Sequence, residues 1–137
     1  IGYMLESGEM DEDELSLFRP SVCNRLDRNT SGIILCGKTI TGEQILSEML
    51  RERTLDKYYL AAVTGRIDKP QEINGYLSKN HRTNKVVITQ THDNESADSD
   101  EIHTYYRPLS YDKDNDATII EVKLITGKTH QIRAHLS

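Results

Sequence analysis

Residues 24–32 read Asn-Arg-Leu-Asp-Arg-Asn-Thr-Ser-Gly, so one acidic side chain, Asp27, stands between two arginines. Nearby positive charge favours the charged form of a carboxylate, and we expect Asp27 to be ionised. The small polar residues that follow are typical of a tight loop, because short hydroxyls bond nearby backbone groups and Gly32 tolerates positive φ. An ionised carboxylate on such a loop is a candidate nucleophile, with an ordinary surface ion pair as the alternative.

Two other segments extend this pattern along the chain. Residues 57–65 read Lys-Tyr-Tyr-Leu-Ala-Ala-Val-Thr-Gly, and residues 124–136 read Leu-Ile-Thr-Gly-Lys-Thr-His-Gln-Ile-Arg-Ala-His-Leu. Together with the first segment, and in the same order, they resemble the motifs of the RluA-type pseudouridine synthases, which isomerise uridine in structured RNA. Asn24 stands where His is commoner in that family. The family's opening lysine-proline strand and the segment after Ser137 are absent, so we expect residues 1–137 to be a fragment of a catalytic domain.

The resemblance implies catalytic roles for three residues. Asp27 is the aspartate that attacks the target uridine, at the base C6 or at the ribose C1′, or that promotes elimination through a glycal. Arg133 pairs with this aspartate across the cleft, where a planar guanidinium can hold a carboxylate in bidentate geometry. Tyr59 stacks on the uracil ring and offers its hydroxyl for proton transfer. The alternatives are a structural ion pair for Asp27, a solvated arginine, and a strand tyrosine that only packs.

A second group of residues is expected to contact RNA or to brace the cleft. Arg25 either props the base stack that a flipped uridine leaves or contacts a phosphate, and Lys57 faces the same side of its strand as Tyr59. The other members of the group are Arg28, Lys128, His130 and Gln131. The implied partner is ribosomal or transfer RNA. No metal or organic cofactor is expected, and RNA specificity would come from RNA shape and from segments outside the core, among them an accessory RNA-binding domain before Ile1.

Composition predicts one ordinary soluble domain. The chain has 137 residues, of which 36% are apolar and 28% charged, and it contains neither an apolar run long enough to span a bilayer nor a signal peptide. We therefore expect no membrane partner. Cys23 and Cys36 are too few for a disulfide framework and lack metal spacing, so they are predicted to be small, reduced core residues, which favours the cytoplasm.

Charge is spread unevenly along the chain. The net charge is -5, yet residues 1–20 hold six acidic side chains against one arginine, which leaves sixteen charges of each sign over residues 21–137. We therefore predict an acidic leader at 1–20, with a mobile loop at 6–14, and a neutral part of the catalytic core at 21–137. A neutral body still permits a basic face for RNA phosphates.

The order of expected elements predicts an α+β fold, a mostly antiparallel mixed β-sheet with flanking helices. A helix should begin with a capping box of Thr41 and Gln44 and a staple of Ile40 and Ile45, and end near Arg53. Strands are expected at 33–36, 56–64, 72–78, 84–90, 102–109 and 117–125, and a short helix at 129–136. Turns are expected at 68–70, 74–75, 92–100 and 112–116.

The sequence also contains signals for two other functions, nucleotide hydrolysis and RNA binding without turnover. Residues 32–39 match the P-loop spacing G-x-x-x-x-G-K-[ST], but their four middle residues favour a strand where a phosphate cradle should be, so nucleotide hydrolysis is not expected. His130 and His135 are five residues apart, unlike the i, i+4 pair of a helical zinc site. The second hypothesis is an RNA-binding module without turnover. Only an isomerase would form a C5-glycosidic nucleoside.

Overall fold

The chain forms two compact units, Ile1–Leu55 and Asp56–Ser137, in a computed structural model that describes residues 1–80, 85–89 and 99–136. The predicted boundary after residue 20 falls inside the first unit. The predicted turn at 92–100 lies outside the described residues except for its last two, which begin a strand. Of the helices in the described ranges, none is long and apolar enough to cross a membrane.

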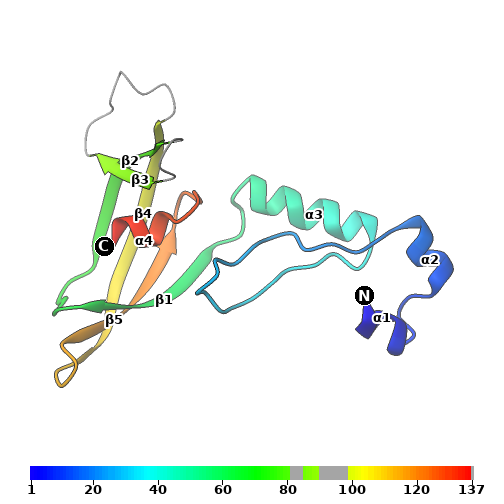
Figure 1. Cartoon of the computed structure of the whole chain (residues 1–137), viewed down its shortest axis with the longest axis horizontal. Helices are drawn as coiled ribbons and strands as arrows, with labels where there is room; N and C mark the ends of the chain where they lie inside the picture. Colours follow the sequence, from blue (N-terminus) through cyan, green and yellow to red (C-terminus); the bar gives the residue numbers. More distant parts are fainter. Residues whose placement is uncertain (81–84, 90–98, 137) are drawn as a thin grey trace. The chain divides into compact units, whose positions relative to one another are not determined.

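The second unit is built on an antiparallel sheet (Figure 1). Its strands lie side by side in the order β1-β5-β4-β2-β3, and each described pair of neighbours is antiparallel. The strands are β1 Lys57–Thr64, β2 Gln71–Asn80, β3 Lys85–Thr89, β4 Ser99–Asp112 and β5 Ala117–Leu124. The α+β class and the antiparallel sheet are therefore confirmed, with β2 and β4 longer than expected.

One predicted turn in this unit is wrong, and another is confirmed. Asn74 and Gly75 lie inside β2, where they pair with His103 and Ile102 of β4. Pairing with a long neighbouring strand overrides the local turn preference of this dipeptide. The turn after Asp112 is present, because the Asp112 carboxylate accepts hydrogen bonds from the amides of Asp114 (2.9 Å) and Asn115 (3.2 Å).

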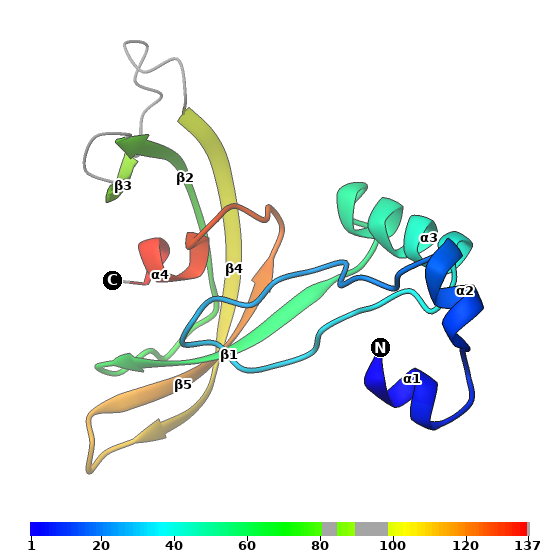
Figure 2. The same ribbon diagram turned by 45° about the vertical axis from the view of Figure 1, so that its right-hand side comes forward.

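The core of this unit lies on one face of the sheet, and a short helix packs there. Tyr106, Ile120 and Val122 are buried, and alternate residues of β1 are half-buried beside them. The helix α4, Gln131–His135, confirms the expectation of a short helix within 129–136. Ile132 and Leu136 pack against the same cluster, which fastens α4 to this face (Figure 2).

The first unit contains α1 (Gly2–Glu6), α2 (Glu12–Leu17) and α3 (Ile40–Arg51). The predicted loop at 6–14 is wrong, because α2 begins within it. Asp11 accepts a hydrogen bond from the Glu14 amide (2.8 Å), and the Glu14 carboxylate accepts one from the Asp11 amide (3.0 Å). This reciprocal capping box turns an acidic run into a helix start, and the acids of the first turn favour the positive end of the helix dipole.

The start of α3 was also predicted two residues too late. The N-cap is Thr39, whose hydroxyl accepts a hydrogen bond from the Gly42 amide (3.0 Å), so Thr41 is already helical. Ile40 and Ile45 are each 52% exposed and form no hydrophobic staple. Thr39 has an extended backbone immediately before the helix, so its side chain caps the free amide of Gly42. Thr41 already lies inside the helix and therefore cannot be the N-cap.

The predicted buried strand at 33–36 is wrong too. This segment makes one isolated bridge, Val22 to Cys36, and Ile33 is 79% exposed. Cys36 is exposed and Cys23 half-buried, so neither is the core residue that was expected, although both are free thiols. An apolar run becomes a strand only where a neighbouring strand pairs with it along its length, and here that pairing is a single bridge.

Candidate active site

The loop that carries Asp27 is closed at its base by the side chain of Asn24. Its Nδ2 donates to the carbonyl of Ile33 (3.0 Å), and its Oδ1 accepts from the amide of Leu35 (2.7 Å). The amide of Cys23 donates to the carbonyl of Leu35 (2.8 Å) beside it. These bonds join residues 23–24 to residues 33–35, so both ends of the loop at residues 25–32 are held in place.

Within this loop the backbone turns directly after Asp27. The amide of Thr30 donates to the carbonyl of Asp27 (2.9 Å), and Gly32 has a φ of +154°, which residues with a Cβ rarely adopt. Asp27 is half-buried, whereas Arg25 and Arg28 are exposed. The loop therefore has the tight geometry expected from its small residues, with guanidinium groups on either side of Asp27 in sequence.

In the second unit, β1 places Lys57 and Tyr59 on the face that α4 covers. Both are half-buried, and Tyr59 packs against the cluster of Tyr106, Ile120 and Val122. The Lys57 ammonium lies over Gly127, only 2.8 Å from the position that a Cβ there would take. A side chain at 127 would push this ammonium aside, so the glycine makes room for it.

Arg133 lies on the exposed part of α4, between two residues that face the core, Ile132 and Leu136. The ion pairs of the described residues in its unit do not include Arg133, although Arg66, Arg107 and Lys123 are all paired. The packing of α4 thus leaves this guanidinium available for an acidic or anionic partner.

The residues before α4 are held by a buried amide. Gln131 is only 1% exposed, and its side chain bonds to Thr104, Thr126, Lys128 and His103. Of the two roles expected for Gln131, contact with RNA does not fit this burial, because its bonding capacity is used within the protein, whereas bracing of the cleft stays a prediction. Lys128 is half-buried and its ammonium pairs with Asp100, and the exposed His130 adopts a φ of +59° at the start of α4.

Three residues of this network were not predicted as site residues from the sequence. Thr104, on β4, is fully buried, and nothing in its local sequence marks it. Thr126 and His135 belong to the third motif. Burial, together with the neighbouring His103, lowers the pKa of His135, so its imidazole is neutral at neutral pH.

The sequence-predicted residues are thus divided between the units. Asp27, with its flanking arginines Arg25 and Arg28, belongs to the first unit. Tyr59 and Arg133 belong to the α4 side of the sheet in the second unit, together with Lys57.

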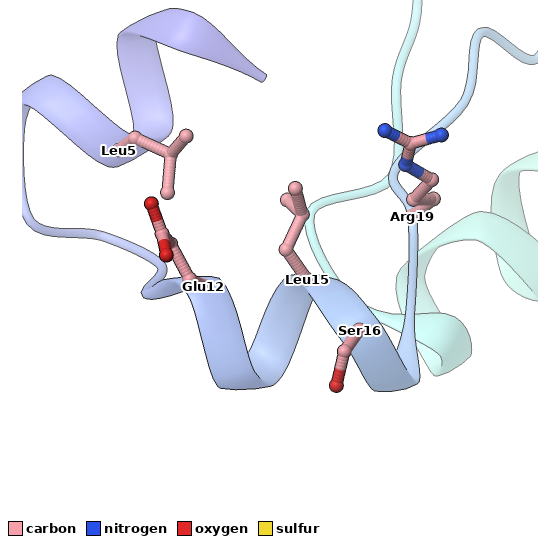
Figure 3. Close-up of a pocket in the computed structure, with 5 residues that line it drawn as sticks. All are labelled: Leu5, Glu12, Leu15, Ser16 and Arg19. Atoms are coloured by element: carbon pink, nitrogen blue, oxygen red, sulfur yellow. The ribbon is translucent and has the colours of Figure 1, made fainter.

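A hollow in the first unit does not coincide with any of these residues. It is lined by Leu5, Glu12, Leu15, Ser16 and Arg19. Figure 3 shows Leu5 on α1 and Leu15 on α2, with Glu12 beside Leu5. Among the residues placed by the structure, no group of three His, Cys, Asp or Glu side chains could hold a metal ion.

Comparison with known proteins places the chain in a family. Residues 7–137 match the family described as RNA pseudouridylate synthase. The chain is 32% identical over 120 residues to ribosomal large subunit pseudouridine synthase D of Nitrosomonas europaea, covering 86% of this chain and 32% of that protein. It is 36% identical over 113 residues to ribosomal large subunit pseudouridine synthase C of Vibrio cholerae, covering 82% and 33%.

Two further comparisons agree. The tRNA pseudouridine(31) synthase of Saccharomyces cerevisiae is 32% identical over 130 residues, covering 84% of this chain and 32% of that protein. Human RNA Pseudouridylate Synthase Domain Containing 1 shares the fold, with a TM-score of 0.73 at 24% identity over 85% of this chain and 49% of that one. The chain spans about a third of the length of these curated relatives. With the family match over nearly its whole length and the three motifs in order, the chain belongs to the RNA pseudouridylate synthase family, in its RluA-type branch.

Proposed function

We propose that the protein isomerises specific uridines to pseudouridine in structured RNA, with Asp27 as the nucleophile. The observation that carries this proposal is the family match over residues 7–137, which includes all three motif segments. The reaction breaks the bond between N1 and C1′, forms a bond between C5 and C1′, and exchanges the C5 hydrogen for one on N1. Atoms and electrons balance without a cofactor or a metal.

Each motif residue has a role in this proposal. Asp27 attacks C6 or C1′, or promotes elimination through a glycal, and Arg133 pairs with its carboxylate. The absence of Arg133 from the ion pairs of its described unit supports this role, since a guanidinium already paired would be less available. Tyr59 stacks on the uracil ring and assists proton transfer.

The remaining motif side chains bind RNA. Arg25 occupies the stack left by the flipped base or contacts a phosphate, and the exposed Arg28 contacts phosphate. Lys57, Lys128 and His130 lie in or beside the segment before α4 and position the RNA backbone there. The substrate is ribosomal or transfer RNA, because relatives of both kinds match the chain. RNA shape, together with an accessory RNA-binding domain outside this sequence, selects the uridine.

The two free thiols support a reducing compartment, and we place the protein in the cytoplasm. A second candidate function is RNA binding without turnover. The observation that favours it is the division of the motif residues between two compact units, because RNA binding alone does not require these side chains to meet.

Tritium release from RNA labelled at uridine C5, with nucleoside mass spectrometry, tests the proposal. We expect Asp27→Asn to abolish pseudouridine formation and to leave RNA binding within about twofold, because the neutral amide is isosteric but not nucleophilic. Asp114→Asn is the matched control, since it removes the same charge from an exposed turn and should retain full activity. Activity that survives Asp27→Asn would contradict the nucleophile, and RNA binding by the wild-type protein with no pseudouridine in any RNA class would favour the binding module.

A further inference from the structure

The side chain of Gln131 links three parts of the second unit. Its Nε2 donates to the carbonyl of His103 (3.0 Å) and to the Thr104 hydroxyl (2.9 Å), both on β4. Its Oε1 accepts from the Thr126 hydroxyl (2.9 Å) and from the Lys128 amide (3.0 Å), both in the loop before α4. Since Gln131 is itself the first residue of α4, one amide joins strand, loop and helix.

These bonds determine which way the amide points. The backbone N–H of Lys128 can only donate, and the carbonyl of His103 can only accept. If the side-chain amide of Gln131 were flipped, Nε2 would face the donor at Lys128 and Oε1 would face the acceptor at His103. All four bonding positions of the Gln131 side chain are used. A side chain that is 1% exposed and saturated in this way has one favourable position.

The network continues beyond Gln131 in both directions. Thr126 Oγ1 accepts from the amide of His103 (2.7 Å), and its hydroxyl donates to Gln131 (2.9 Å) in preference to the more distant carbonyl of His103 (3.4 Å). Thr104 Oγ1 lies 2.8 Å from Nδ1 of His135, at the other end of α4. If Thr104 donates to Nδ1, only His135 Nε2 lacks a partner in the described structure, whereas the opposite direction would leave two buried groups unmet. Hydrogen bonds therefore run in one direction from Thr126 through Gln131 and Thr104 to His135.

The helix that carries Arg133 depends on such anchors. α4 has five residues, far fewer than an isolated helix needs in water, so its position is set by the contacts that hold it. Ile132 and Leu136 supply apolar packing, which is not directional. The bonds of Gln131 are directional, and they act two residues before Arg133 and three after Lys128.

We propose that Gln131 is a positioning residue of the isomerase site, which fixes the segment 126–130 and Arg133 against β4 through its buried amide. This inference rests on the proposed function, in which Arg133 pairs with the nucleophile. Gln131 touches neither RNA nor Asp27 in this role. It sets the geometry of groups that do, and misplacement of such groups by about 1 Å can lower turnover by roughly 100-fold.

Kinetics of Gln131→Met and Gln131→Glu in the full protein test this proposal. Methionine fills a similar volume but makes none of the four bonds, whereas glutamate keeps the two acceptor bonds and loses the two donor bonds to β4. We expect kcat to fall by roughly tenfold or more in both variants, with KM for RNA within about twofold, since the cations that bind RNA remain. The Lys128 amide should exchange its hydrogen at least about tenfold faster in Gln131→Met, because it loses its acceptor.

Thr118→Val is the matched control for lost stability. Thr118 is fully buried at the start of β5, where its hydroxyl accepts from the Ile67 amide (3.0 Å) and donates to the Gly65 carbonyl (2.6 Å). This variant breaks two buried bonds in the same unit, at the end of β5 opposite Leu124, and should leave kcat and the Lys128 amide unchanged. An equal fall of kcat in Thr118→Val and Gln131→Met would overturn the proposal in favour of a merely structural role.

Thr126→Val supplies a milder break in the same network should Gln131→Met fail to fold. It should lower kcat in the same direction, and Thr126→Ser, which keeps the hydroxyl, should restore it. Wild-type kcat in both Gln131 variants would overturn the proposal. A wild-type protein that makes no pseudouridine would instead overturn the proposed function, and exchange at the Lys128 amide would then decide whether Gln131 holds this segment.

Discussion

The side chain of Asn24 takes the place of a backbone pair at the base of the Asp27 loop, because a carboxamide both donates and accepts as a peptide group does. Neighbouring backbone bonds are sparse there, with one bridge and the bond from Cys23 to Leu35. Closure of the loop therefore depends heavily on a single residue. The geometry also gives a reason for asparagine at this position, since its Oδ1 and Nδ2 reach a donor and an acceptor on the opposite arm.

We expect Asn24→Asp to open this loop. Aspartate keeps the bond from the Leu35 amide but presents an oxygen to the carbonyl of Ile33, where Nδ2 had donated. Pseudouridine formation should fall by roughly tenfold, and the Leu35 amide should exchange faster. Asn74→Asp adds the same charge on an exposed strand position and should change neither measurement. If Asn24→Asp retained full activity while its Leu35 amide exchanged faster, catalysis would not depend on closure of this loop.

His135 makes stability depend on pH in a direction that follows from its environment. Burial lowers its pKa in the folded state, so the unfolded chain binds the proton more readily. The contribution of His135 to stability is therefore full above the ordinary histidine pKa of about 6.5 and declines as the pH falls below it. We expect Tm to drop between pH 7 and pH 5 by more in the wild type than in His135→Asn, whose amide can accept from Thr104 but does not titrate. Parallel pH profiles of the two proteins would contradict this assignment.

At the scale of elements, both Thr39 and Thr41 are candidates for the N-cap of α3, and in the structure the N-cap is Thr39. Thr39→Ala should lower the free energy of unfolding by about 1 kcal/mol, because the Gly42 amide loses its acceptor. Thr41→Ala should be neutral or slightly stabilising, because Thr41 is helical and alanine has the higher helix propensity. Chemical denaturation of both variants measures the difference, and a larger loss from Thr41→Ala would reassign the cap.

The elements also show what could be predicted from the sequence. Strands β1 and β5 were expected within one residue of their observed bounds, because β1 is rich in Tyr, Ala and Val and β5 contains Thr, Ile and Val, a composition that favours strands. The strand predicted at 33–36 is wrong, because an apolar run forms a strand only beside a partner, which the local sequence does not specify. The spacing of Asp11 and Glu14 fits a capping box, but the acidic composition of residues 6–14 favoured a loop over a helix.

The candidate site was predictable only as far as its motifs reach. The roles of Asp27, Tyr59 and Arg133 come from family resemblance, and they stay predictions until the variants are measured. The buried network around Gln131 was not foreseen, because Thr104 is supplied by β4, far from the third motif in sequence. Burial of a polar side chain is a property of tertiary packing, and no pattern within residues 124–136 reveals it.

At the scale of the whole molecule, net charge opposes the proposed substrate. Binding of RNA depends on cations that release counterions, yet the chain carries a net charge of -5, with six acids in its first twenty residues. Glu6→Gln combined with Asp13→Asn should therefore tighten RNA binding by a few-fold at 50 mM salt, with the gain shrinking at 200 mM. Both side chains are exposed. Titration of labelled RNA at the two salt concentrations measures this, and an equal effect at both would exclude an electrostatic origin.

The division of the chain at residue 55 has a practical consequence. The proposed nucleophile belongs to one unit, and the tyrosine and arginine that would assist it belong to the other. Two separately expressed halves, cut between Leu55 and Asp56, would each lack part of the proposed catalytic residues and should form no pseudouridine alone. Turnover would return only on reassociation, so pseudouridine in a reporter transcript would record whatever fused partners bring the halves together. If the proposed isomerase activity holds, the two halves would serve as a split reporter whose signal is a stable modification of RNA.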